Sequence, residues 1–81
     1  MTTEAIYASL TDIFRETFDD ESFVLRPDLA AADVKGWDSF KQVEILIAVQ
    51  ERFGLKLTSR EIDSLACVGD LVSVIERHQA A

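Results

Sequence analysis

The chain has 81 residues, which is enough for one small domain with a limited hydrophobic core. Fifteen acidic against eight basic residues give a net charge of −7, which disfavours nucleic acid and anionic lipid as partners and favours a basic protein surface. The single cysteine, Cys67, excludes an internal disulfide and is expected to be a small, buried or half-buried thiol in a reducing compartment. No signal-peptide pattern opens the chain and no apolar run is long enough to cross a bilayer, so we expect a cytoplasmic protein without membrane insertion.

The first half of the chain predicts a helix followed by a long loop. Residues Glu4 to Phe18 carry apolar side chains at the spacing of an amphipathic helix, which begins after Thr2 or Thr3. The periodicity fails from Asp19 to Trp37, a segment that contains the only proline. We expect an ordered loop whose apolar side chains pack on the core, namely Phe23, Leu25, Leu29 and Val34.

The second half predicts three more helices. Ser39 to Phe53 form one, which ends at Gly54 because glycine readily adopts the left-handed conformation that closes a helix. Thr58 and Glu61 have the spacing of a capping box at the start of a short helix. The apolar residues of that short helix are Ile62 and Leu65.

A last helix is expected from Gly69-Asp70 to about His78. Its apolar residues are Leu71, Val72, Val74 and Ile75. No strand pattern or repeat interrupts the series of helices. The predicted fold is therefore all-α: a four-helix bundle with a long loop between the first and second helices and a short third helix.

The stretch GWDSF, Gly36 to Phe40, lies where the long loop meets the second helix. Ser39 and Gln42 have the spacing of a capping box, so the simplest interpretation makes Ser39 the helix N-cap. A hydroxyl at an exposed helix start is also an attachment point, because the helix dipole stabilises an anion bound there. Both interpretations are compatible with one another.

The predicted second helix has two apolar arcs, since each residue turns it by about 100°. One arc is expected in the core and contains Ile45, Leu46, Val49 and Phe53. The other arc is either core in a bundle that wraps this helix or an exposed patch. An apolar stripe edged by carboxylates suits a partner with an apolar groove and a basic rim. The expected partner-binding residues are Phe40, Val43, Glu44, Ile47 and Glu51.

GWDSF is followed by a helix that ends in ERFG and then by TSREIDSL and VGDLV. Over essentially the whole chain this series resembles the acyl carrier proteins and related thiolation domains. The resemblance implies that Asp38-Ser39-Phe40 is the D-S-L-type motif of that family, with Phe in place of Leu. Ser39 would then carry a covalent 4′-phosphopantetheine arm, derived from coenzyme A and attached by a phosphopantetheinyl transferase that contacts Asp38.

The resemblance further implies that residues 1–81 form a single, non-enzymatic and monomeric carrier domain. It would hold an acyl or aminoacyl group as a thioester, receive it from a loading enzyme and deliver it to acyl-transferring enzymes with basic docking surfaces. The predicted second helix is less acidic than expected of a fatty-acid-synthesis carrier, because it contains Lys41, Gln50 and Arg52. This difference favours a role in a specialised pathway. Trp37 replaces a smaller residue and either alters recognition or caps the core.

The alternative function is an unmodified, acidic, helical interaction module in which Ser39 is only an N-cap. A serine hydrolase is disfavoured because the lone His78 is expected on a solvated helix end, far along the chain from Ser39. The acidic stretch DDES lacks the Gly and the closing Glu of a calcium loop, so no metal site is expected.

Overall fold

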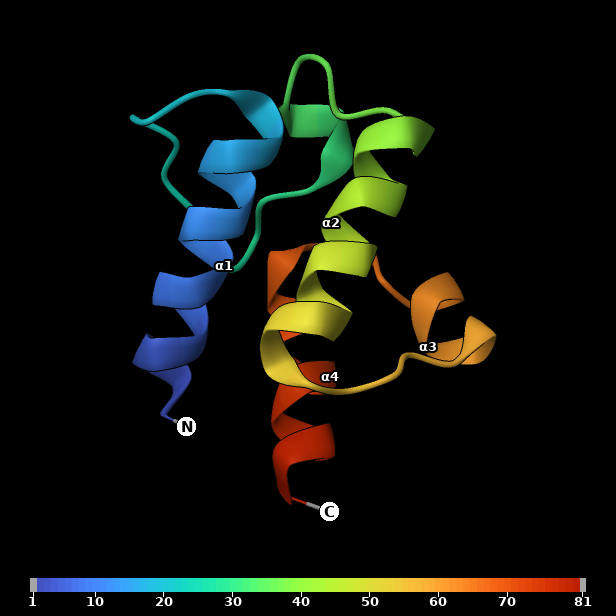
Figure 1. Cartoon of the computed structure of the whole chain (residues 1–81). Coiled ribbons are helices and arrows are strands. Elements are labelled where there is room, and N and C mark those ends of the chain that lie inside the picture. The colour runs from blue at the N-terminus through green and yellow to red at the C-terminus, as the bar shows by residue number, and fades with distance from the viewer. Residues whose placement is uncertain (1, 81) are drawn as a thin grey trace.

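The computed structural model describes residues 2–80, which form four α-helices and one 3-10 helix. The helices are α1 (Thr3–Phe18), α2 (Ser39–Phe53), α3 (Ser59–Asp63) and α4 (Val68–Ala80), and the 3-10 helix η1 (Ala31–Asp33) lies in the long loop. Figure 1 shows that α1 runs antiparallel to α2 and α4, while α3 lies on the outer side of α2. Residues 2–80 contain no strand. The predicted all-α bundle with a short third helix is confirmed.

Local sequence signals set most helix ends. The side chain of Thr2 caps α1 by accepting a hydrogen bond from the Ala5 N–H at 3.1 Å. Gly54 ends α2 in the left-handed conformation, with φ of 63°. The capping box of α3 forms as predicted: the Glu61 N–H donates to Thr58 Oγ1 at 3.2 Å, and the Thr58 N–H donates to Glu61 Oε1 at 2.9 Å.

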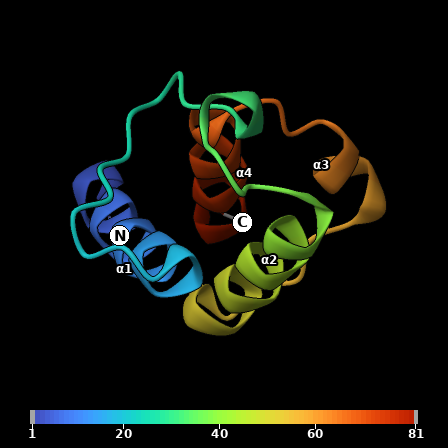
Figure 2. The ribbon, with the colours of Figure 1, turned by 90° about the horizontal axis from the view of Figure 1, so that it is seen from above.

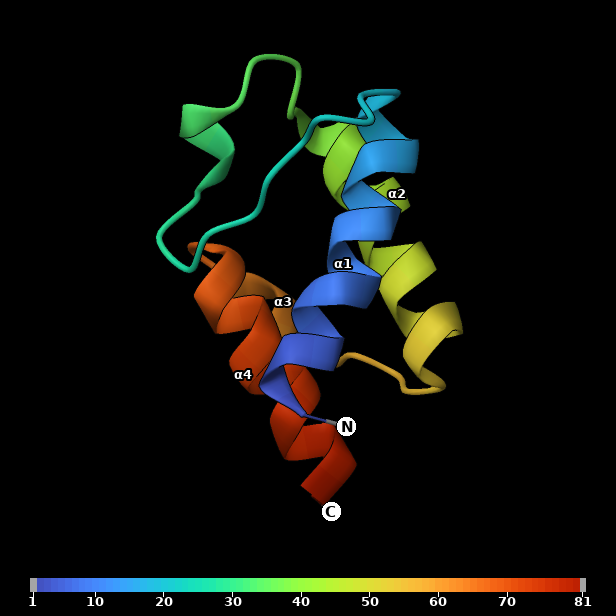
Figure 3. The same cartoon turned by 90° about the vertical axis from the view of Figure 1, so that its left-hand side faces the viewer.

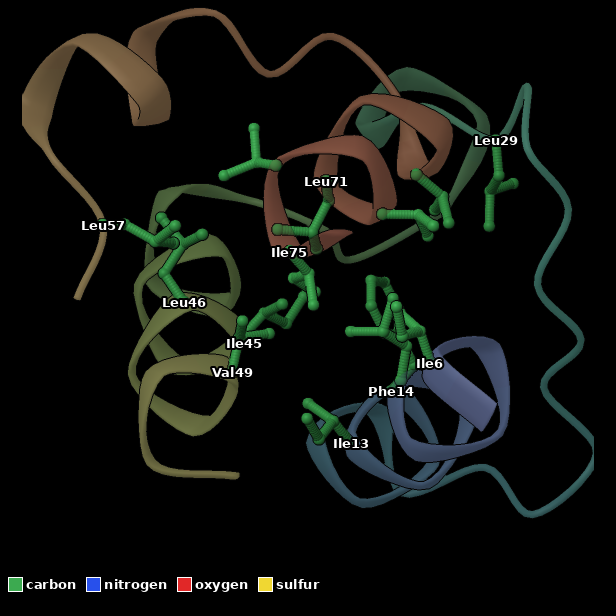
Figure 4. Close-up of a cluster of buried hydrophobic side chains, with 14 residues drawn as sticks. Ile6, Ile13, Phe14, Leu29, Ile45, Leu46, Val49, Leu57, Leu71 and Ile75 are labelled. Carbon is green, nitrogen blue, oxygen red and sulfur yellow. The ribbon is translucent and has the colours of Figure 1, made fainter. Parts of the chain in front are cut away.

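The core lies where α1, α2 and α4 meet, and their apolar side chains point to a common centre (Figure 4). Figure 2 shows these three helices around that centre, with α3 to one side. The buried residues are Ile6, Leu10, Ile13, Phe14, Leu29, Ile45, Leu46, Val49, Leu57, Val68, Leu71, Val72, Val74 and Ile75. The prediction that Phe53 belongs to the buried core is wrong: as the last residue of α2 it is half-buried and packs against the core from its edge.

The long loop between α1 and α2 packs on the core as predicted and crosses to the start of α4 (Figure 3). The side chains that make these contacts are Phe23, Leu25, Leu29 and Val34. Leu29 is buried, and its carbonyl accepts a hydrogen bond from the Val68 N–H at 2.8 Å. The Pro27 carbonyl accepts one from the Gly69 N–H, also at 2.8 Å. A Cβ on Gly69 would lie 3.0 Å from the Pro27 oxygen, a tight contact, so this close approach favours glycine.

The chain brings the start of α1 and the end of α4 together, opposite the start of α2 (Figures 1 and 3). Thr3 Oγ1 donates to Glu76 Oε2 at 3.0 Å at this end. His78 lies nearby and is half-buried, with Nε2 at 3.0 Å from both carboxylate oxygens of Glu61. The expectation of a solvated His78 is therefore wrong, because the Glu61 carboxylate of α3 binds the imidazole and helps to cover it. No helix within residues 2–80 combines the length and apolar character of a membrane span.

Candidate functional site

Ser39 is the first residue of α2, and its side chain is exposed. The N-cap is Asp38, which has an extended backbone and whose Oδ1 accepts a hydrogen bond from the Lys41 N–H at 3.0 Å. The prediction that Ser39 caps α2 and that Gln42 completes a capping box is therefore wrong. The carboxylate of Asp38 already occupies the capping position, and the amide oxygen of Gln42 accepts a hydrogen bond from Trp37 instead. The Ser39 hydroxyl makes no side-chain hydrogen bond within residues 2–80, and the residue is exposed to solvent.

The environment of Ser39 suits a bound anion. Its Oγ lies at the N-terminus of a helix of 15 residues, where the backbone N–H groups of the first turn and the helix dipole favour negative charge. Lys41 fixes this turn to α1, because its Nζ donates to the carbonyl of Thr17 at 3.0 Å and lies 3.8 Å from a carboxylate oxygen of Glu44. A phosphodiester on Ser39 therefore fits the residues that the structure places there.

Trp37 anchors the loop that leads into α2. Its ring meets Phe14 and Phe18 edge to face, with centroids 5.2 and 6.1 Å away. Its Nε1–H donates to Gln42 Oε1 at 2.8 Å. Of the two roles left open for Trp37, these contacts support the one in which it covers the core.

A pocket of about 570 Å³ opens beside Ser39. Its exposed lining residues include Asp38, Ser39 and Val43, which lie at the rim. Buried or half-buried apolar side chains form most of the remaining lining, namely Phe14, Trp37, Ile45, Leu46, Ile62, Leu65, Val68 and Leu71, and the half-buried Gln42 lies among them. The half-buried, free Cys67 also lines it. No sequence pattern predicts this pocket, because its walls come from α1, the loop, α2, α3 and the start of α4.

The second apolar arc of α2 is exposed. Phe40 is 80%, Val43 55% and Ile47 51% accessible, so the alternative of a core that wraps α2 is excluded. Glu44 and Glu51 are also exposed on this helix. We call Phe40, Val43 and Ile47 the exposed stripe. Since Val43 belongs both to the stripe and to the pocket rim, the stripe borders the pocket.

Comparison with known proteins identifies the family. Residues 8–75 match the family model described as the phosphopantetheine attachment site. The chain is 30% identical over 76 residues to a meromycolate extension acyl carrier protein of Mycolicibacterium smegmatis, covering 94% of this chain and 77% of the relative. It is 29% identical over 75 residues to an acyl carrier protein of Acidothermus cellulolyticus, covering 93% and 89%.

The fold is similar to the solution NMR structure of holo acyl carrier protein from Geobacter metallireducens. The TM-score is 0.85 at 32% sequence identity, over 91% of this chain and 85% of that one. This helical bundle, with a match to the phosphopantetheine-attachment model over residues 8–75, defines a protein that carries a covalently attached group. The chain belongs to the phosphopantetheine-attachment family of acyl carrier proteins, and its prosthetic group is a covalent 4′-phosphopantetheine.

Proposed function

We propose that the 4′-phosphopantetheine of this acyl carrier protein is attached to Ser39 Oγ, and that residues 1–81 act as a single carrier domain without catalysis of their own. The observation that carries the proposal is the exposed Ser39 hydroxyl at the first residue of α2, which is not used by the helix cap. The transfer forms an ester bond between Ser39 Oγ and the phosphorus of the phosphopantetheine. Adenosine 3′,5′-bisphosphate leaves coenzyme A, and the Ser39 hydroxyl proton passes to a base of the transferase.

The arm ends in a thiol, which holds an acyl or aminoacyl group as a thioester. The pocket beside Ser39 offers such a group an apolar interior. Each methylene that leaves water for that interior contributes about 0.8 kcal/mol. This contribution supports a carrier that shelters its cargo between encounters with enzymes.

The exposed stripe and its two flanking glutamates support docking on enzymes with basic surfaces. Apolar side chains that face solvent lose water-accessible area when a partner covers them, and Glu44 and Glu51 attract a basic rim. Charge-steered association and fast release suit a carrier that must visit a transferase, a loading enzyme and an acyl-transferring enzyme in turn.

We further propose that this carrier serves a specialised pathway rather than housekeeping fatty-acid synthesis. Its location is predicted to be cytoplasmic. Relatives named as meromycolate extension carriers support the pathway proposal. Both basic residues of α2 have partners on α1: Lys41 Nζ donates to the Thr17 carbonyl, and Arg52 Nη2 lies 3.2 Å from Asp12 Oδ2. Basic residues on α2 therefore contribute to α1–α2 packing, besides any effect on recognition.

The proposal is tested by incubating the apo-protein with coenzyme A and a broad-specificity phosphopantetheinyl transferase, then measuring the intact mass. We expect the addition of one phosphopantetheine to the wild type and none to Ser39→Ala. Ser59→Ala is a matched control, because Ser59 is also an exposed first residue of a helix, and it should be loaded normally. Modification of Ser39→Ala, or a wild type that no transferase modifies, would contradict the proposal. The mass of the protein from its native cells distinguishes a carrier from an unmodified interaction module.

A further inference from the structure

The carboxamide of Gln42 is fixed in one orientation on the pocket wall. Gln42 lies one turn after Ser39 in α2, and its Oε1 accepts the Trp37 Nε1–H at 2.8 Å. An indole N–H only donates, so the atom facing Trp37 must be the amide oxygen and the NH₂ group must lie on the other side. Within residues 2–80 that NH₂ group makes no hydrogen bond.

Trp37 keeps this orientation because it is itself packed against Phe14 and Phe18. A donor whose rotamer is already fixed loses little conformational entropy when it binds an acceptor. Gln42 is therefore a preorganised donor rather than a flexible surface amide.

The other polar side chains of the pocket do not offer a strong donor, and the backbone N–H groups of the first turn of α2 are left to the phosphodiester proposed on Ser39. The Asp38 carboxylate only accepts, and the Trp37 N–H is already used. The Ser39 hydroxyl is consumed by the proposed attachment, and the Cys67 thiol is a weak donor. Transfer of a carbonyl oxygen from water into this largely apolar pocket costs about 1–3 kcal/mol if the oxygen finds no hydrogen-bond donor there. Gln42 is the side chain that removes this penalty.

We propose that Gln42 is a positioning residue whose amide N–H donates to a carbonyl oxygen of the loaded arm, with Trp37 fixing its orientation. This inference rests on the proposed attachment at Ser39. The carbonyl belongs either to the thioester or to an amide of the arm, and the two share the same acceptor chemistry. Because Val43 borders both the pocket and the exposed stripe, a partner that docks on the stripe reaches the place where the carbonyl is bound.

The test compares apo, holo and octanoyl-loaded protein. Trp37 is the only tryptophan, so its indole ¹⁵N–¹H resonance is assigned at once. A shift of this resonance already on conversion to the holo form indicates an amide carbonyl of the arm, whereas a shift only on octanoyl loading indicates the thioester carbonyl. No shift in either form would overturn the proposal.

The second readout is the rate at which hydroxylamine cleaves the octanoyl thioester, relative to free octanoyl-pantetheine. We expect the wild type to be protected, and Gln42→Met and Gln42→Glu to be cleaved about 2- to 10-fold faster, the factor that corresponds to one net hydrogen bond. Trp37→Phe keeps a ring and loses the N–H, so it should lose part of the protection. Glu16→Gln on α1 is the control, because Glu16 is exposed and lies outside the pocket lining, and it should be cleaved at the wild-type rate.

A structural role of Gln42 alone would destabilise the holo and octanoyl forms equally. The proposal requires instead that the gain in melting temperature on octanoyl loading becomes smaller in Gln42→Met. An unchanged gain together with wild-type cleavage rates, or a wild-type thioester cleaved as fast as octanoyl-pantetheine, would overturn the role of Gln42 and leave attachment at Ser39 intact. Failure to load Ser39 at all would overturn both proposals.

Discussion

The Asp38 carboxylate accepts a hydrogen bond from the Lys41 backbone N–H at 3.0 Å, and this contact closes the N-terminus of α2. Its effect is to leave the adjacent Ser39 hydroxyl outside the cap. The residue that stabilises the helix start is thereby separated from the residue proposed to carry the prosthetic group, so the two roles are separable by mutation.

Asp38→Ala should destabilise the apo-protein by about 0.5–2 kcal/mol, because α2 loses its N-cap. Ser39→Ala should change the free energy of unfolding by less than about 0.5 kcal/mol, since its hydroxyl makes no capping bond. Chemical denaturation of the apo-proteins measures both. Asp38→Asn keeps a good cap and should be nearly as stable as the wild type, so slower loading of this variant would isolate a contact between the Asp38 charge and the transferase. A Ser39→Ala protein as unstable as Asp38→Ala would contradict this assignment of the cap.

Phe40→Ala should lower the free energy of unfolding by about 1 kcal/mol or less, because the ring is 80% exposed. Phe14→Ala, which empties a fully buried position, should cost about 3–5 kcal/mol. Phe53→Ala is expected between the two, since Phe53 is only half-buried. Denaturation curves give the three values.

Phe40→Ala should nevertheless slow loading of Ser39 or transfer to a partner enzyme, because the ring belongs to the exposed stripe next to Ser39. A loading assay on the same protein measures this. Loading and transfer at the wild-type rate would show that Phe40 takes no part in docking.

Glu44→Lys and Glu51→Lys should slow association with a basic partner enzyme and leave the fold intact, because both carboxylates are exposed. The effect should shrink at high salt, which screens exposed charges. Stopped-flow or surface-based kinetics at two salt concentrations measure it. Glu16→Lys on α1 makes the same change of charge away from the stripe and serves as the control. Equal effects of all three substitutions would mean that only net charge matters.

The ionised Glu61 carboxylate should stabilise the folded protein at neutral pH, and this stabilisation should be lost in acid. The backbone N–H of Thr58, and after it the His78 side chain, hold the pKa of the Glu61 carboxyl below its usual value. A lowered pKa in the folded state stabilises the protein above the pKa of the unfolded chain, and this stabilisation is lost as the pH falls through the folded value. Glu61→Gln should therefore be less stable than the wild type at pH 7, with a difference that shrinks below about pH 4.

Thermal unfolding of both proteins between pH 7 and pH 3 measures the Glu61 effect. His78→Ala removes one of the two partners of the carboxylate and should reproduce part of the loss at pH 7. A stability difference between Glu61→Gln and the wild type that stays constant over the whole range would contradict the assignment to this carboxylate.

The sequence by itself determined the helices and several of their ends. The stop at Gly54 and the capping box of Thr58 and Glu61 depend on residues at most four positions apart, so their physics is contained in a short stretch. The family was equally accessible, because its motif and helix order are read along the chain. The core arcs of α2 and α4 followed from periodicity, apart from Phe53 at the helix end.

Only the tertiary structure decided the features that depend on how distant segments meet. Periodicity showed that α2 has a second apolar arc, but its exposure depends on α1 and α4 covering the other side of the helix. The choice of Asp38 over Ser39 as cap depends on the extended backbone at the end of the loop, which Trp37 anchors against Phe14 and Phe18. Contacts between separate elements likewise form the pocket, the fixed amide of Gln42 and the pairing of His78 with Glu61. The free energy of such contacts depends on residues from several segments of the chain, so no single stretch of sequence predicts them.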